Sequence, residues 1–493
     1  MDYLNTDKAR RQKILLLTGY VLIAIMVVLS TLILVYITEG YRISKNGVIQ
    51  NGLVFFDSQP NPANIYVNNK LEPSTTNTSF LLPSGLYNIK ITAKGYMSWR
   101  RQIQVIGGTV QTYDYPFLFP RKLITHSIDV FSAQPQFVSQ SPNRQYVMVE
   151  STNTPTNFDI FNLNSPASAP RIISVPSNIL YPNLTPATIS NQSWQLVQWS
   201  TDNQNVLLQY SFNQTSEFIL VNINNPAKSV NLSQLFQTYN FNSISLVNNQ
   251  YNLYDLYNTN TKVLDQVSLN SPLVINSVLT QVLAYKTYST NTTLYVTTLN
   301  APNGTALVEE EVGSTNYYIQ KVTLASSYLL DLTDYNDVQY VVVGQKNKPD
   351  INIYQDPVNQ IINDPTQKPF PIQVLRINNP NYLSFSDNAH FIMVENGSHF
   401  AVYNEQSGLA YNYIVPYSLQ APQTHATWMD GDRIVYITNN HLLVFDFNDQ
   451  NLHILEPADS QYLPFFDVNY QYIYTIVNKK GLGYLTQTAT FVP

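Results

Sequence analysis

The hydrophobic pattern of the chain consists of one long apolar run followed by many short alternating segments. Residues 14–37 read ILLLTGYVLIAIMVVLSTLILVYI and contain no charged side chain. A helix of this length, at about 1.5 Å per residue, exceeds the roughly 30 Å hydrocarbon thickness of a bilayer. No later stretch is as long without polar interruption, so the sequence predicts a single crossing in contact with membrane lipid. The predicted transmembrane helix extends from Ile14 to Ile37, and its membrane-anchoring residues include Ile14, Leu22, Val28 and Ile37.

The charges before the run predict its orientation. The tail 1–13 carries the basic residues Lys8, Arg10, Arg11 and Lys13. By the positive-inside rule, the N-terminus is then cytoplasmic and the C-terminal part is extracytoplasmic. The alternative is a cleaved signal peptide, whose apolar core is normally about 7–15 residues and is followed by a small-x-small site. Because the run is longer and residues 34–38 read LVYIT, we expect a retained single-pass anchor in the cell membrane.

A short connector, 38–50, leads to residues 51–120, where apolar and polar positions alternate over short segments. Pairs of strands are predicted around Pro60 and Pro62, and again around the turn that contains Pro83 and Gly85. Proline fixes φ in such turns, and glycine reaches backbone angles that other residues avoid. The segment is therefore expected to be a small all-β unit.

The order and spacing of its motifs resemble the PEGA domain, a small β-sandwich module of bacterial and archaeal envelope proteins. The family-naming positions read Pro60-Asn61-Pro62-Ala63, so the flanking Pro and Ala are kept and the central pair differs. The resemblance implies binding or spacing at the cell surface and no catalytic residues. The residues that carry it are Ser58, Pro60, Ala63, Tyr66, Pro83, Gly85, Tyr87, Gly95 and Tyr96.

From 124 to 493 one pattern recurs: an aromatic or apolar pair, a Ser/Asp/Asn turn, and two alternating strands. Two copies begin at Trp199 and Trp428, and seven or eight copies fill the region. A four-stranded sheet cannot bury both faces alone, so this spacing predicts a β-propeller. The pattern is similar to TolB-like or WD40-like propellers of exported bacterial proteins, and an array of β-sandwiches is the structural alternative. Side-chain-to-backbone turn bonds are expected at Asn143, Asp202, Asp387 and Asp430.

Composition narrows the possible functions. Charged residues make up only 12% of the chain, the 36 tyrosines favour half-buried strands, and there is no cysteine. The absence of cysteine excludes a disulfide, a thiolate metal site and a thiol nucleophile. A net charge of −6, with few basic clusters after the tail, predicts no binding of nucleic acid.

No motif indicates catalysis. There is no HExxH, GxSxG or Walker sequence, and the six histidines are not clustered. Asp331, Asp334 and Asp337 form an acidic cluster, but their spacing is not that of a calcium-binding loop. The three consecutive glutamates at 309–311 are expected to be solvated. We therefore predict no catalytic residue, metal or cofactor. The leading hypothesis is a non-catalytic envelope protein that binds a surface protein or glycan; the alternatives are a propeller hydrolase or lyase acting on envelope polysaccharide, and an accessory subunit of a membrane or secretion complex.

Overall fold

The computed structural model describes residues 6–38, 41–44, 47–180, 190–419 and 425–492. Two compact units divide the chain. The first contains residues 1–122 together with 491–493, and the second contains residues 123–490. The second unit thus begins at Leu123, and the last three residues of the chain belong to the first unit.

The first element is α1 (Thr6–Thr38), which contains the predicted apolar run. Within the described residues, one helix, over Arg10–Tyr36, is long and apolar enough to cross a membrane, and none of it is buried against the rest of the chain. The hydroxyl of Thr18 donates to the carbonyl of Ile14 at 2.8 Å, and Ser30 makes a similar bond one turn back along the helix. Each bond gives the side-chain hydroxyl a hydrogen-bond partner, which hydrocarbon would not provide.

The side chains along α1 are outward-facing. Ile14, Leu22 and Val28 are 56%, 58% and 59% exposed. The helix begins at Thr6, before the apolar run, so its first turns are polar and include Arg10, Arg11 and Lys13. The side chains of Lys8 and Ile37 lie outside the described part of the structure, as do residues 1–5 of the tail.

Two four-stranded sheets form the rest of the first unit. One has the order β1-β2-β5, with β8 parallel to β2, and the other has the order β4-β3-β6-β7. Both sheets contribute to one buried cluster, which includes Phe56 of the first sheet and Trp99 of the second, so the unit is a β-sandwich. The strands are β1 (Tyr41–Ser44), β2 (Gly47–Phe56), β3 (Asn64–Val67), β4 (Lys70–Thr75), β5 (Thr78–Pro83), β6 (Gly85–Thr92), β7 (Trp99–Val105) and β8 (Val110–Tyr113).

The expected connector 38–50 is shorter than predicted. Its residues include β1 and the first part of β2, which pair as an antiparallel hairpin from Tyr41↔Gln50 to Ser44↔Gly47. In this sheet β1 lies at the edge, whereas β2 pairs with β1, β5 and β8. Only two residues separate the end of α1 from the first strand.

In the second unit, the described residues form eight four-stranded antiparallel sheets, numbered here 1 to 8 in chain order. Sheet 1 contains β10 (Val138–Gln140), β11 (Tyr146–Glu150), β12 (Asn157–Asn162) and β13 (Arg171–Ser174), and sheet 2 contains β14 (Ser193–Trp199), β15 (Asn205–Phe212), β16 (Thr215–Asn222) and β17 (Val230–Asn231). Sheet 3 contains β18 (Ser243–Leu246), β19 (Leu253–Asn258), β20 (Val263–Ser268) and β21 (Ser271–Leu279), and sheet 4 contains β22 (Val282–Ser289), β23 (Thr292–Thr297), β24 (Thr305–Val312) and β25 (Thr315–Thr323). Short helices α2 (Ser177–Leu180) and α3 (Leu232–Leu235) and the 3-10 turns η2 (Pro226–Lys228) and η3 (Val247–Asn249) connect them.

The remaining sheets follow the same order. Sheet 5 contains β26 (Tyr328–Tyr335), β27 (Val338–Gln345), β28 (Asp350–Gln355) and β29 (Gln373–Arg376), and sheet 6 contains β30 (Tyr382–Phe385), β31 (Phe391–Glu395), β32 (His399–Asn404) and β33 (Ala410–Ile414). Sheet 7 contains β34 (Thr427–Trp428), β35 (Arg433–Thr438), β36 (His441–Asp446) and β37 (His453–Pro457), and sheet 8 contains β38 (Phe465–Phe466), β39 (Tyr472–Lys479), β40 (Leu482–Ala489) and β9 (Thr125–Phe131). Helix α4 (Pro357–Asn363) lies between β28 and β29.

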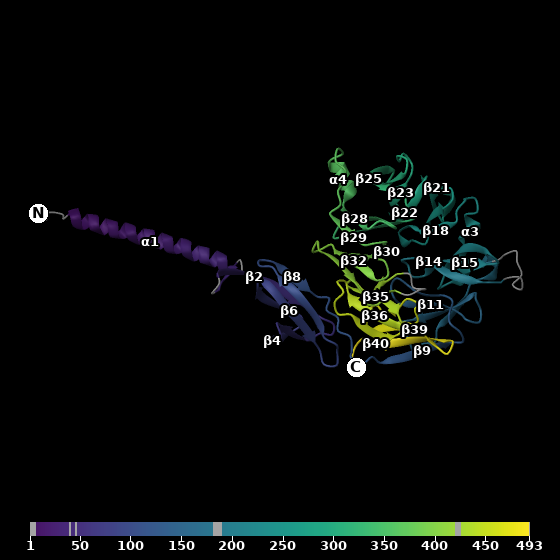
Figure 1. Ribbon diagram of the computed structural model, residues 1–493, viewed down its shortest axis with the longest axis horizontal. Coiled ribbons are helices and arrows are strands. Elements are labelled where there is room, and N and C mark those ends of the chain that lie inside the picture. The colour runs from purple at the N-terminus through teal and green to yellow at the C-terminus, as the bar shows by residue number, and fades with distance from the viewer. Residues whose placement is uncertain (1–5, 39–40, 45–46, 181–189, 420–424, 493) are drawn as a thin grey trace. The chain divides into compact units, whose positions relative to one another are not determined.

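The sheets form a closed ring, a β-propeller. Figure 1 shows their labelled strands around a common centre. Sheet 8 takes its outermost strand, β9, from the start of the unit, where it pairs antiparallel with β40. Sheets 8 and 1 also share a buried cluster that includes Val147, Val149, Tyr474 and Ile476. The first and last sheets are thus packed together, which an open array of sandwiches would not require.

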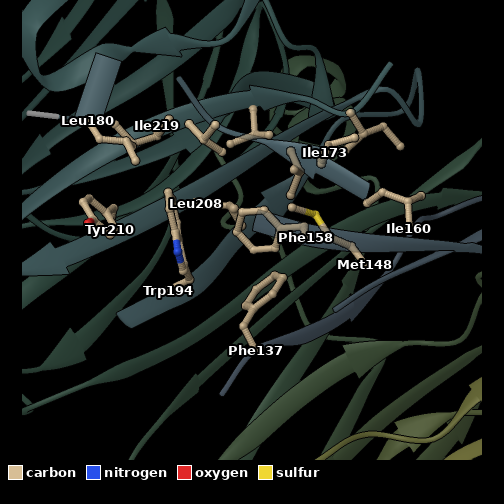
Figure 2. Packing of buried hydrophobic residues seen from close by; sticks show 14 of the residues in the cluster. Phe137, Met148, Phe158, Ile160, Ile173, Leu180, Trp194, Leu208, Tyr210 and Ile219 are labelled. Atoms are coloured by element: carbon tan, nitrogen blue, oxygen red, sulfur yellow. The ribbon is translucent and has the colours of Figure 1, made fainter. Parts of the chain in front are cut away.

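Each pair of neighbouring sheets shares a buried apolar face or direct hydrogen bonds. Figure 2 shows the cluster between sheets 1 and 2, where Phe158 packs edge-on against Trp194 with ring centroids 5.2 Å apart. Because both faces of such a sheet are covered, its second strand is buried throughout: all six residues of β35 are buried, including Arg433 and Thr438. The outermost strand β33 instead alternates between exposed and half-buried residues.

Candidate functional site

Four sheets connect their first two strands by the same turn. In the turns that begin at Ser141, Ser200, Ser386 and Asp467, the carbonyl of the first residue accepts from the N–H three residues later, at 2.8–3.1 Å. The first N–H in turn donates to the carbonyl five residues later. This geometry places the fourth residue in the left-handed region, with φ values of 56–59°. The fourth residues are Arg144, Asn203, Ala389 and Tyr470.

The side chain of the third residue fixes the turns of sheets 1 and 2, and an Asp side chain makes the same kind of bond in sheet 7. Asn143 Oδ1 accepts from the N–H of Gln145 at 3.1 Å, and Asp202 Oδ1 accepts from the N–H of Gln204 at 2.9 Å. In sheet 7 the carboxylate of Asp430 accepts from the N–H groups of Asp432 and Arg433, both at 2.8 Å. These are the bonds that an Asx turn uses.

The turn of sheet 6 differs from the expectation. There Asn388, rather than Asp387, accepts from a backbone N–H, that of His390 at 3.1 Å. The sequence contains the signal that identifies it: Ser141-x-Asn143 and Ser386-x-Asn388 share a spacing, and in both the serine hydroxyl donates to the Asn side chain at 2.7 Å. Asp387 is therefore free of the turn bond and points to another partner.

That partner is Arg144, which donates to the Asp387 carboxylate and forms an ion pair with it. Sheets 1 and 6 are not neighbours in the ring, so these turns meet at its axis. The Arg144 guanidinium also lies 4.5 Å from the ring centroid of Tyr470, in sheet 8. Asn203, from sheet 2, accepts from the N–H of Asn143 at 2.8 Å. We call Asn143, Arg144, Asn203, Asp387 and Tyr470 the axial turn cluster.

A second ion pair lies beside the cluster. Arg433 Nε donates to Asp430 Oδ2 at 2.7 Å, and the two side chains are only 8% and 6% exposed. Burial raises the pKa of Asp387; the Arg144 charge opposes this shift and the Asp430 charge adds to it. Burial also raises the pKa of Tyr470 to about 12. Two cationic and two anionic side chains thus compensate one another at this end of the axis.

The turns of sheets 6 and 7 are packed tightly. A Cβ atom at Gly431 would lie 2.2 Å from Asn388 Nδ2, whose amide is held by two hydrogen bonds in its own turn. We expect Gly431→Ala to destabilise the propeller by about 1–3 kcal/mol, because Asn388 must move to admit the methyl group. Urea unfolding measures the loss.

A double-mutant cycle separates this clash from other causes. The cost of Gly431→Ala should shrink when Asn388 is already Ala. An equal cost in both backgrounds would show that the contact with Asn388 is not responsible.

The other acidic and histidine candidates remain apart. Within the described residues, no three His, Asp or Glu side chains are arranged to hold a metal ion. Asp331 pairs with Lys286 at 2.9 Å, and His390 stacks on Tyr335 with centroids 5.5 Å apart. Of the glutamates at 309–311, expected to be solvated, Glu310 is fully buried because alternation in β24 turns it inward.

The motif residues of the first unit form turns and core. The hydroxyl of Ser58 donates to Thr76 Oγ1 at 2.9 Å, and Thr76 Oγ1 accepts from the N–H of Ala63 at 2.8 Å. Sequence reasoning missed Thr76, which is buried at the centre of this network. Tyr96 is 8% exposed, and its hydroxyl accepts from the N–H of Val492 at 2.7 Å.

Three more motif residues have polar or cationic neighbours. The Tyr87 hydroxyl donates to the carbonyl of Pro83 at 3.0 Å. The ammonium of Lys90 lies 5.2 Å from the ring centroid of Tyr66. Gly95 has φ +86° and lies against Val492. These contacts build a turn-rich sandwich and leave no cluster of reactive groups.

The family model of the PEGA domain matches residues 51–118. These residues are a PEGA domain. The match agrees with the resemblance in the sequence and covers the sandwich without α1. The PEGA domain begins inside β2 and ends just before Phe119, so β1 is an addition at its edge. No curated protein matches the chain.

Solved structures similar to the chain include propellers. An oligogalacturonate lyase from Vibrio parahaemolyticus has 10% identity and a TM-score of 0.37, covering 73% of this chain and 98% of its own. The Hsv2 protein of Kluyvelomyces marxianus has 8% identity and a TM-score of 0.40, with coverage of 67% and 100%. The β-propeller domain of Myceliophteria thermophila Cps50 (Swd1) has 10% identity and a TM-score of 0.34, with coverage of 75% and 100%. Likenesses at this level say nothing about activity.

Proposed function

We propose that the protein is a membrane-anchored envelope protein that binds a surface protein or glycan without catalysing a reaction. In this proposal α1 spans the membrane with its N-terminus in the cytoplasm, and the PEGA domain and the propeller are extracytoplasmic. The observation that carries the proposal is the fully exposed apolar surface of α1, which needs lipid around it, directly before two folded β units.

The short link after α1 supports a role close to the membrane. Residues 39 and 40 alone separate α1 from β1. At about 3.5 Å per residue, the first strand begins within roughly 10 Å of the end of the helix. The PEGA domain is then a spacer next to the bilayer rather than a module on a long tether.

The axial turn cluster supports binding over catalysis. A glycoside hydrolase needs two carboxyl groups flanking the scissile bond, one to protonate the leaving group and one to attack or activate water. Asp387 and Asp430 are each paired with an arginine. Asp202 and Asp467, in the turns of sheets 2 and 8, each accept from a backbone N–H of their own turn. Their arrangement holds the ring together, so partners are expected to bind at the rim.

Topology mapping tests the anchor. Protease added to intact cells should cleave a tag after residue 493 and spare a tag before residue 1. Replacing Lys8, Arg10, Arg11 and Lys13 by Gln should raise the share of chains with an exposed N-terminal tag, because the basic residues hold the tail inside. Four Lys→Gln changes at Lys262, Lys346, Lys348 and Lys368 of the propeller are the matched control.

Two outcomes would contradict the proposal. One is cleavage of the N-terminal tag in the unmodified protein. The other is a mature chain whose mass shows removal of α1. Binding itself is measured with proteoliposomes that carry the full chain facing outward: they should retain isolated envelope fragments that protein-free liposomes do not.

A further inference from the structure

A groove of about 550 Å³ opens on the side of sheet 2. Its walls come from β15, β16, α3 and the segment 237–242 that leads to sheet 3. This volume lies within the range of pockets that hold small molecules, about 300–1,000 Å³. The groove is lined by Gln209, Ser216, Phe218, Ser233, Gln237, Tyr239, Phe241 and Asn242.

The lining combines aromatic rings with neutral polar groups and contains no charged residue. Phe241 stacks on Phe218 with centroids 6.1 Å apart, and Phe241 and Tyr239 are half-buried, so each ring keeps an open part. The side-chain amides of Gln209 and Gln237 form no hydrogen bond with the described part of the chain. An amide both donates and accepts hydrogen bonds, as a sugar hydroxyl does.

The aromatic wall is fixed by the core beneath it. Phe236 is fully buried and packs edge-on against Tyr254 with centroids 5.5 Å apart. The N–H of Tyr239 donates to the carbonyl of Phe236 at 2.9 Å, which holds Tyr239 beside the groove. Asn231 caps α3 by accepting from the N–H of Gln234 at 3.0 Å. A wall built in this way loses little conformational entropy on binding.

One contact argues against a peptide as the occupant. A peptide would add to a strand edge through backbone hydrogen bonds. Along the groove, β17 pairs with β16 only at Ile219 and Leu220, so the edge begins at Phe218. There the hydroxyl of Ser233 accepts from the N–H of Phe218 at 2.8 Å. The first backbone donor that a peptide strand would use is therefore already occupied.

We propose that this groove binds a neutral oligosaccharide of hexose or N-acetylhexosamine units. The apolar C–H face of a sugar ring packs on Phe241 and Tyr239, and its hydroxyl edge meets Gln209 and Gln237. An acidic polysaccharide would require Lys or Arg in the lining, where none is present. The inference rests on the proposed binding function and specifies the ligand class and place.

The test uses the full chain in proteoliposomes and fluorescent maltohexaose, cellohexaose, mannohexaose and chitohexaose, with oligogalacturonate as the acidic comparator. At least one neutral probe should bind, and oligogalacturonate should not. Phe241→Ala and Gln237→Ala should each weaken binding about tenfold, the effect of losing one well-placed contact. Tyr251→Ala is the matched control, because Tyr251 is 43% exposed in the same unit and outside the groove.

The outcomes separate this inference from the broader function. If the groove variants still retain envelope fragments and no neutral probe binds, the groove proposal is wrong. The broader binding function is then unaffected. Binding of oligogalacturonate alone, or a peptide ligand displaced by Phe241→Ala, also overturns it. If the unmodified chain neither retains envelope fragments nor binds a probe, the proposed function is contradicted as well.

Discussion

Replacing Arg433 by Met is expected to lower the free energy of unfolding of the propeller by about 3–5 kcal/mol. The variant leaves the carboxylate of Asp430 without its counter-ion at a site where it is only 6% exposed. Asp446, which is 3% exposed, also loses a nearby positive charge. A buried charge without a partner is costly because the protein interior solvates it poorly. Urea unfolding followed by tryptophan fluorescence measures the change.

An arginine in an exposed pair is the matched control. Arg376 Nε lies 3.3 Å from Asp350 Oδ1, and these side chains are 80% and 55% exposed. Arg376→Met should cost less than about 1 kcal/mol, since water screens such pairs. Adding Asp430→Asn to Arg433→Met should restore part of the stability, because Asn still accepts the turn N–H groups. Equal losses in the two single variants would show that burial does not govern the effect.

Raising the pH from 5 to 8.5 is expected to destabilise the propeller by several kcal/mol. Burial raises the pKa values of Glu150, Glu310 and Glu395 to about 7 and that of Glu405 to about 8. These values lie above those of the unfolded chain, so the folded state binds more protons between about pH 4.5 and 8. Stability is then full below pH 4.5 as far as these groups are concerned, and it falls as pH rises through the folded pKa values.

Glu405 provides the clearest test of this pH dependence. Its side chain is buried, and neither carboxylate oxygen has a hydrogen-bond partner among the described residues. Glu405→Gln should stabilise the protein at pH 8.5, by on the order of 1–2 kcal/mol, and change little at pH 5, where the glutamate is already neutral. Thermal unfolding across this pH range measures the difference. The half-buried Glu311 supplies the control, and a pH slope that Glu405→Gln leaves intact would contradict the assignment.

The large features of the fold could be predicted because their signals are local. An uninterrupted apolar run indicates a membrane helix, and repeated Asx turns between alternating strands indicate propeller sheets. The PEGA domain is visible for the same reason, since its turns and spacing lie within one continuous segment of the chain. Residues such as Asp202 and Asp430 are recognisable because the turn bond needs only their neighbours in sequence.

The site details could not be predicted because they depend on contacts between distant residues. Arg144 and Asp387 are 243 residues apart, and nothing in either sequence neighbourhood indicates the other. The groove on sheet 2 is built from ordinary Gln, Ser and Tyr residues between positions 209 and 242, which carry no motif. The burial of Glu310 depends on strand register, which a run of three identical residues does not reveal.

The pairing of β9 with β40 also determines when the protein can finish folding. Thr125 and Thr488 hydrogen-bond to each other although they are 363 residues apart in the chain. During synthesis β9 must therefore wait for nearly all of the propeller to be made. Until Tyr474 and Ile476 arrive, the apolar face of sheet 1 that they cover stays open. Nascent chains of this protein are therefore expected to expose this apolar face during most of their synthesis, a stage at which a chaperone would limit aggregation.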